Sequence, residues 1–157
     1  MTSRRAQYLR LAIVATVVIA IDQVTKSLAL ASFEEQPADV IDGILTFRIT
    51  YNSGGAFGLL QGLPGLFLVA TLVATVVILF WVRNLDRPAW MLPLGMVLGG
   101  GVGNLIDRTV RSTDGQVVDF IDFHVWPVFN LADACIVVGV LWLVFLGGRE
   151  EVERMAQ

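Results

Sequence analysis

The sequence predicts an all-α membrane protein, built from four transmembrane helices with a small extracytoplasmic β segment. The 157 residues are 55% hydrophobic with a mean hydropathy of +0.71, whereas soluble domains are about 45–50% apolar. The apolar residues gather in four stretches, each near the ~20 residues that cross about 30 Å of hydrocarbon. Between the first two stretches, β-branched and aromatic residues flank a turn signal. A chain of this length forms one small bundle, so we expect a single four-helix domain over residues 1–157.

The four spans are expected at residues 9–31, 63–82, 90–106 and 128–146. The first follows three arginines and resembles a signal peptide. However, Asp22, Gln23 and Lys26 follow it without a small-x-small cleavage site before them, so we expect an uncleaved span. The third span is short and contains five glycines. Small residues let helices approach closely in lipid, which favours an inner position for this span.

The β segment is expected at residues 40–51, with a turn at Asp42 and Gly43. Because isolated strands do not survive in lipid, it should lie at the membrane surface. The glycine-containing stretch 52–58, which starts with Asn52, then leads into the second span.

Basic residues set the orientation of the spans. Arginines precede the first span, lie between the second and third, and follow the fourth, whereas the other two loops are mainly acidic. We therefore expect both termini in the cytoplasm. The net charge of −3, without a basic run, argues against a nucleic-acid partner. The single cysteine, Cys135, forms no intramolecular disulfide and is interpreted as a packing residue.

Polar residues of the spans gather near the outer surface in this topology: Asp22, Lys26, Asn52, Asn104, Asp107, Arg108, Asn130 and Asp133. Several are three or four residues apart on one helix face and can aim at a common centre. Ionisable residues within a membrane indicate a functional site by default.

Structural roles are open for several of these residues. Asp22 and Lys26 can form a buried ion pair that fixes helix packing. Asn104 can bond a neighbouring helix or contact a substrate. Asp107 favours a structural role, and Arg108 either a functional one or the snorkelling of a helix-end residue.

Two aspartates carry the strongest signal. Asp133 lies about two turns into an apolar run, where a carboxylate costs about 2.5–3.5 kcal/mol. Asp119 gains weight as its partner, because two close carboxyls share one proton near neutral pH, as in aspartic proteases. Asp122 and His124 are expected in a solvated loop, and His124 lacks companion metal ligands.

At these residues the chain resembles bacterial lipoprotein signal peptidase, also called signal peptidase II, an intramembrane aspartic peptidase family. The matching stretches follow the order of the family and run from the first span to the fourth: 22–26, 51–57, 103–108, 117–123 and 129–133. The resemblance implies an endopeptidase that removes the signal peptide of a diacylglyceryl-modified prolipoprotein, cleaving before the lipidated cysteine.

The resemblance also implies the roles of the site residues and the partners. Asp119 and Asp133 would be the catalytic dyad; Asn52, Asn104, Arg108 and Asn130 would bind substrate and lipid; Asp22 and Lys26 would support the site. No metal or cofactor is implied, globomycin-type peptides would inhibit, and the enzyme would lie in the bacterial cytoplasmic (inner) membrane. A single four-helix unit holds the whole site, so a monomer is expected. The connection between Asp107 and Asp119 looks a few residues longer than the family pattern.

Two other functions remain open from the residues alone. A proton-coupled transporter also uses buried polar residues, but here they gather near one surface instead of marking a path across. A magnesium-dependent phosphotransferase would need clustered carboxylates, and no Asp-rich metal spacing is present.

Overall fold

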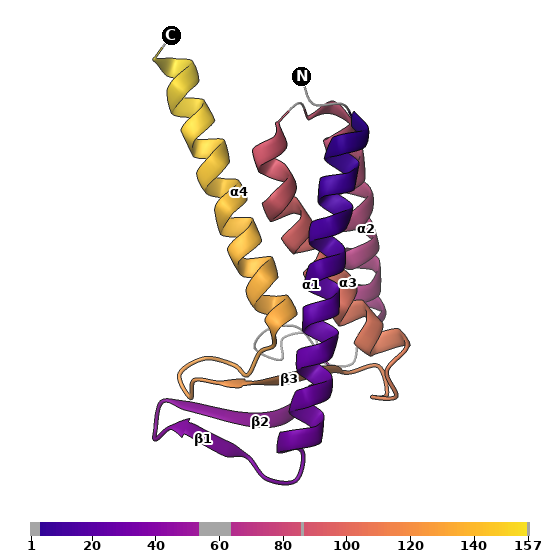
Figure 1. The fold of residues 1–157 in the computed structure, drawn as a ribbon, viewed down its shortest axis with the longest axis vertical. Helices are drawn as coiled ribbons and strands as arrows, with labels where there is room; N and C mark the ends of the chain where they lie inside the picture. The colour runs from indigo at the N-terminus through magenta and orange to yellow at the C-terminus, as the bar shows by residue number, and fades with distance from the viewer. Residues whose placement is uncertain (1–3, 54–63, 86, 157) are drawn as a thin grey trace.

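A computed structural model describes residues 4–53, 64–85 and 87–156 (Figure 1). Its helices are α1 (Arg4–Phe33), α2 (Pro64–Asn84), α3 (Met91–Thr109) and α4 (Leu131–Met155), and a 3₁₀ turn (Pro88–Trp90) precedes α3. Its strands are β1 (Ala38–Ile41), β2 (Leu45–Asn52) and β3 (Val117–Asp122). The predicted helical protein with a small β segment is confirmed at this level. Residues 54–58 of the expected glycine-containing stretch lie outside the described part.

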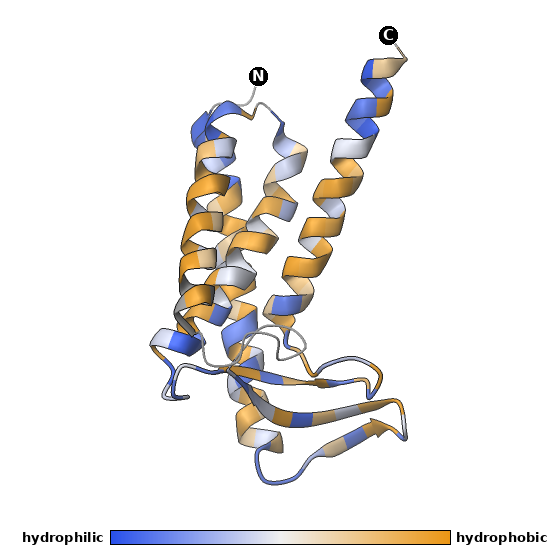
Figure 2. Cartoon of the chain, turned by 180° about the vertical axis from the view of Figure 1, so that it is seen from behind, coloured by the Kyte–Doolittle hydropathy of each residue, from blue (hydrophilic) through white to orange (hydrophobic). Residues whose placement is uncertain are grey.

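Three of these helices are long and apolar enough to cross a membrane: α1, α3 with its preceding turn, and α4. In α2, the described apolar stretch is the shorter segment Val69–Asn84. Figure 2 shows apolar residues along the middle of the helices and polar ones at both ends. The two termini lie at one end of the bundle and the sheet at the other (Figure 1).

Helix α3 lies at the centre of the bundle, packed against α1, α2 and α4. Its glycines bring the neighbouring backbones close, since a Cβ at Gly99 would lie 2.8 Å from the Ala15 carbonyl oxygen. A Cβ at Gly100 would lie only 2.5 Å from the carbonyl oxygen of Ala132 in α4. The inner position predicted for the third span is therefore confirmed, and it places the far end of α3 against the first turn of α4.

The strands form one antiparallel sheet in the order β1-β2-β3. The predicted turn after β1 is confirmed, and Gly43 adopts the positive φ of 68° that favours glycine. The sequence prediction did not include β3, which adds to β2 and pairs Asp119 with Thr50. Asp119 therefore lies on a strand, whose backbone fixes it more tightly than a loop would.

Helix α4 begins at Leu131, later than the predicted start at 128, because Asn130 is its N-cap residue. The Asn130 side chain accepts a hydrogen bond from the Asp133 backbone N–H (3.0 Å), and the Asp133 carboxylate accepts one from the Asn130 N–H (3.3 Å). The prediction that Asp133 lies two turns into a span was wrong. It lies in the first turn, where a carboxylate satisfies an orphan N–H and meets the positive end of the helix dipole.

Asp122 also differs from the sequence prediction, which expected it in a solvated loop. It ends β3, is 4% exposed, and accepts a 2.6 Å hydrogen bond from Arg48 Nε. This bond holds the pKa of Asp122 below its ordinary value. His124, half exposed, follows with a positive φ and contacts the Thr46 hydroxyl. The pair of contacts ties the chain after β3 back onto β2.

Candidate active site

Asn130 connects the two aspartates that the sequence singled out. Its side-chain Nδ2 donates to Asp119 Oδ1 at 2.6 Å, while its backbone N–H donates to Asp133 Oδ2. Asn130 is fully buried, so these bonds have no water competing for them. Asn130, the N-cap residue of α4, thus binds the carboxylate of Asp119 in β3 and the carboxylate of Asp133 in α4.

Two further amides complete the hydrogen bonds to the pair. Asn52, the last residue of β2, donates from Nδ2 to Asp119 Oδ2 at 2.8 Å. Asn104 of α3 donates from Nδ2 to Asp133 Oδ1 at 2.8 Å, and its own oxygen accepts from Asn130 Nδ2 at 3.1 Å. Each carboxylate therefore receives hydrogen bonds at both of its oxygens.

The pKa of Asp119 is raised to about 7, with burial of its carboxyl group as the largest cause. The nearby Asp133 carboxylate adds to the rise, because a second negative charge disfavours ionisation. The hydrogen bonds from Asn52 and Asn130 act in the opposite direction and stabilise the ionised form. Asp119 is thus placed to exchange a proton at neutral pH.

A cavity of about 310 Å³ opens beside this pair, between the sheet end of α3, the first turns of α4 and the β3–α4 connection. Four residues of the predicted site line it: Asn52, Asn104, Arg108 and Asp133. Asp119 is 1% exposed and joins the cavity wall through its bond to Asn52. Apolar side chains such as Val128 and Ile136 complete the lining, which suits a partly apolar ligand.

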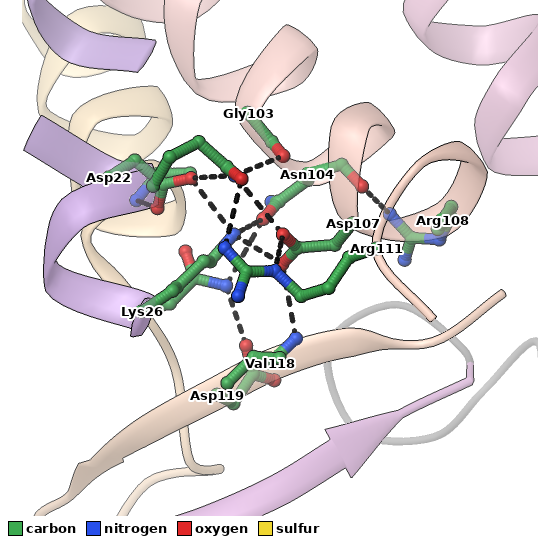
Figure 3. Close-up of polar contacts among 12 residues, drawn as sticks. Asp22, Lys26, Gly103, Asn104, Asp107, Arg108, Arg111, Val118 and Asp119 are labelled. Carbon is green, nitrogen blue, oxygen red and sulfur yellow. Dashed lines mark hydrogen bonds and ion pairs between the residues drawn. The ribbon is translucent and has the colours of Figure 1, made fainter. Parts of the chain in front are cut away.

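Behind the cavity, Lys26 of α1 forms a buried centre of charge (Figure 3). Its ammonium lies 3.0 Å from Asp22 Oδ2 and 2.7 Å from Asp107 Oδ2, and it donates to Asn104 Oδ1 at 2.9 Å. All three charged side chains are 0% exposed. The ion pair expected from the spacing of Asp22 and Lys26 is present. The three donors of the ammonium each have a partner.

The two carboxylates of this centre also bind the backbone next to each candidate aspartate. Asp22 Oδ1 accepts from the N–H of Ala132, one residue before Asp133, at 3.1 Å. Asp107 Oδ2 accepts from the N–H of Val118, one residue before Asp119, at 3.2 Å. The charged centre around Lys26 therefore fixes the positions of both β3 and α4.

Sequence reasoning gave no separate role to Gln23 or Arg111, which the structure brings into this network. Gln23 Nε2 donates to Gly103 O and to Asp107 Oδ1, each at 3.1 Å. Arg111 Nε lies 3.1 Å from Asp107 Oδ1. The four-residue spacing of Asp107 and Arg111 was a local signal for this ion pair.

Arg108 lines the cavity, and its Nη1 donates a 3.4 Å hydrogen bond to Asn104 O of its own helix. In the described part of the chain, no three His, Cys, Asp or Glu side chains are grouped so that they could hold a metal ion.

Comparison with known proteins gives a consistent set of relatives. The family described as signal peptidase (SPase) II matches residues 14–147. The lipoprotein signal peptidase of Rhodococcus jostii (strain RHA1) is 44% identical over 145 residues, which cover 88% of this chain and 72% of that protein. That of Caldicellulosiruptor bescii is 38% identical, covering 83% of this chain and 87% of that protein.

Among solved structures, a bacterial membrane enzyme determined by the in meso method is similar to this chain with a TM-score of 0.80. The two share 26% sequence identity, and the match covers 90% of this chain and 88% of that one. The match therefore extends over most of both chains.

Proposed function

The chain belongs to the signal peptidase II family, whose members process lipoprotein signal peptides, and we propose that it does so as an intramembrane aspartic endopeptidase with Asp119 and Asp133 as its catalytic dyad. The observation that carries the proposal is the bridge through Asn130, which bonds one carboxylate from its side chain and the other from its backbone. Two carboxyls held together in a buried site share one proton.

The mechanism follows from that shared proton. The ionised aspartate acts as general base on a water molecule, while the protonated one hydrogen-bonds the scissile carbonyl. Water attacks the carbonyl carbon, and the base takes its proton. The protonated aspartate stabilises the developing oxyanion. Collapse of the tetrahedral intermediate breaks the C–N bond, the leaving amine takes a proton, and the pair again holds one. The apparent pKa values belong to the pair.

The remaining site residues orient the pair and the substrate. Asn52, Asn104 and Arg108 line the cavity and are placed to contact substrate or its lipid, and Asn130 orients both aspartates. Asp22 and Lys26 support the site through the backbone of α4 and the side chain of Asn104. Both side chains are 0% exposed and neither lines the described cavity, which is consistent with a supporting role.

The substrate follows from the family and from the position of the site. We propose a diacylglyceryl-modified prolipoprotein, cleaved before its lipidated cysteine, with its lipid chains remaining in the bilayer. Globomycin-type peptides would compete for the same cavity. One copy of the chain brings together both aspartates and the cavity, so the site needs no residue from a second copy, and we propose a monomeric enzyme.

The lengths of the apolar helices and the positions of the arginines support a membrane topology. We propose that α2 is a fourth transmembrane span beside α1, α3 and α4, and that the whole chain is one membrane domain. The arginine-rich terminal end would face the cytoplasm and the sheet end the outer face of the bacterial cytoplasmic (inner) membrane. The site would then lie near the outer surface, where a secreted prolipoprotein emerges.

A cleavage assay tests the function. Purified protein in detergent should cleave a diacylglyceryl-modified prolipoprotein, seen as a shift on a gel, equally with and without a chelator. The same precursor without its lipid should be cut poorly. Failure of a folded protein to cleave would contradict the proposed reaction, and inhibition by chelator would contradict the aspartic mechanism.

The pH dependence of cleavage should report the dyad. Because the pKa of Asp119 is raised to about 7, the pair loses its shared proton as the pH rises through that value. We expect kcat to fall about tenfold per pH unit above this range. Replacing Asn52 with leucine removes a hydrogen bond that favours the ionised form of Asp119. The pH at which kcat begins to fall on the alkaline side should therefore be higher in this variant. A fall that begins at lower pH would contradict the assignment.

A further inference from the structure

We infer that Arg111 is a positioning residue for Asp119, acting through Asp107 and Gln23. The inference rests on the proposed function, since it concerns the geometry of the same dyad. Arg111 lies in the connection between α3 and β3. It does not line the cavity, so any effect on the reaction must pass through other residues.

Asp107 divides its two oxygens between two sets of partners (Figure 3). Oδ2 receives the Lys26 ammonium at 2.7 Å and the Val118 N–H at 3.2 Å. Oδ1 receives Arg111 Nε at 3.1 Å and Gln23 Nε2 at 3.1 Å. Four donors from different parts of the chain thus fix the rotation of one buried carboxylate. If the Oδ1 side loses its partners, the carboxylate can turn and the Val118 bond weakens.

The guanidinium of Arg111 contacts both Asp107 and Gln23, the other donor to Oδ1. While Nε holds Asp107, Nη2 donates to Gln23 Oε1 at 3.0 Å. A flipped Gln23 amide would turn its NH₂ group toward the guanidinium and its oxygen toward Asp107, so the Arg111 bond favours the observed orientation. Arg111 thus adds to the acceptors Gly103 O and Asp22 Oδ2 in orienting this amide, and it also holds Asp107 directly.

Charge balance points the same way. Asp22 and Asp107 place two carboxylates around the single ammonium of Lys26, and all three are 0% exposed. The guanidinium of Arg111, 19% exposed, lies against Asp107 as a second cation. Without it, an excess negative charge would remain buried behind the dyad, which favours distortion or water entry.

The connection is folded to keep Arg111 in this place. The Val110 and Arg111 N–H groups both bond the Ile106 carbonyl, and the Thr113 hydroxyl lies 3.1 Å from Asp107 O. The segment after α3 is thus tied to the end of that helix, and it places the guanidinium in the network.

Substitution of Arg111 by methionine tests the inference, because it keeps an aliphatic stem like that of arginine but removes the charge and the donors. We expect kcat for the lipid-modified prolipoprotein to fall about tenfold with KM within twofold of wild type, since a shift well below 1 Å in the reacting groups is enough. The kcat of Arg111→Lys should lie between those of the wild type and Arg111→Met. The ammonium of lysine keeps the charge but cannot bind Asp107 Oδ1 and Gln23 Oε1 with the fixed geometry of a guanidinium.

Arg149→Met is the matched control. Arg149 also pairs with an acidic residue four positions away, Glu153, but both are 63% exposed and far from the site in the sequence and the fold. This variant should keep the kcat and KM of the wild type. A kcat of Arg111→Met equal to that of the control, or a raised KM with unchanged kcat, would overturn the inference.

A second readout is independent of cleavage. Amide hydrogen exchange of Val118, measured in detergent, should become faster in Arg111→Met and remain unchanged in Arg149→Met. If Arg111→Met does not fold, Arg111→Lys decides, since wild-type exchange and kcat in that variant would refute the positioning role. If Arg111→Met shows faster Val118 exchange but the wild-type protein shows no cleavage activity, the proposed function is refuted and the positioning of Val118 by Arg111 is retained.

Discussion

Replacing either Asp119 or Asp133 with asparagine should reduce cleavage of a lipid-modified prolipoprotein by at least about 10³-fold. Asparagine nearly matches aspartate in shape but can neither accept the proton of the attacking water nor supply one to the carbonyl. The loss should appear in kcat, because in the proposed mechanism the cavity and the membrane would provide most of the binding of the precursor. Initial rates from the gel-shift assay, compared at equal amounts of folded protein, measure it.

The two substitutions differ in their local effects. At Asp119, both oxygens accept from side-chain amides, so an introduced NH₂ group meets another NH₂ unless Asn52 or Asn130 rotates. At Asp133, one acceptor is lost from the capping box of α4. Loss of a helix cap costs about 1 kcal/mol, which is too little to unfold the protein.

Asp42→Asn is the control for this pair of variants. Asp42 lies exposed in the turn between β1 and β2, at a distance from the dyad along the sheet. It should retain full activity. Normal turnover by a well-folded Asp133→Asn protein would refute the aspartic mechanism, whatever the behaviour of Asp119→Asn.

Replacing Lys26 with methionine should destabilise the protein more than any surface substitution. The change leaves Asp22 and Asp107 as two buried carboxylates without their common cation, and breaking a buried pair costs about 3–5 kcal/mol. The Asn104 oxygen also loses a donor. We expect a lower unfolding temperature in detergent together with loss of cleavage, since β3 and α4 are held by the same carboxylates.

Two further variants separate charge from packing at this position. Adding Asp22→Asn and Asp107→Asn to Lys26→Met removes the stranded charges, so it should restore part of the stability but little of the activity. Arg154→Met breaks an exposed pair with Glu151 and should cost no more than about 1 kcal/mol. Equal unfolding temperatures for Lys26→Met and Arg154→Met would contradict a structural role for the buried centre.

The sequence predicted those parts of the fold that depend on local patterns. Helical spans follow from apolar length, the β1–β2 turn from Asp42 and Gly43, and the pairing of Asp22 with Lys26 from helical spacing. The ion pair between Lys26 and Asp107 could not be predicted, because it depends on how α1 and α3 are rotated about their own axes. Spacing within one helix gives no information about that rotation.

The remaining differences have the same origin in tertiary contacts. Phe129 pairs with Ile121, so the chain stays extended up to Asn130 and α4 starts later than its apolar run. Asp122 is covered because Arg48 of the neighbouring strand reaches it. The sequence of an apolar run or of an acidic loop alone does not indicate such tertiary partners. The motif residues that the sequence singled out near one membrane surface do lie together in the structure.

The shared ammonium of Lys26 has a consequence for how the enzyme is made. Its partners, and the backbone N–H groups that donate to those partners, come from α1, α3, β3 and α4, and so from segments that leave the ribosome far apart in time. A chain whose last helix has not yet docked lacks the arrangement that brings the two aspartates together. Proteolytic competence is therefore expected only at the end of assembly, which protects nascent membrane proteins around an unfinished copy.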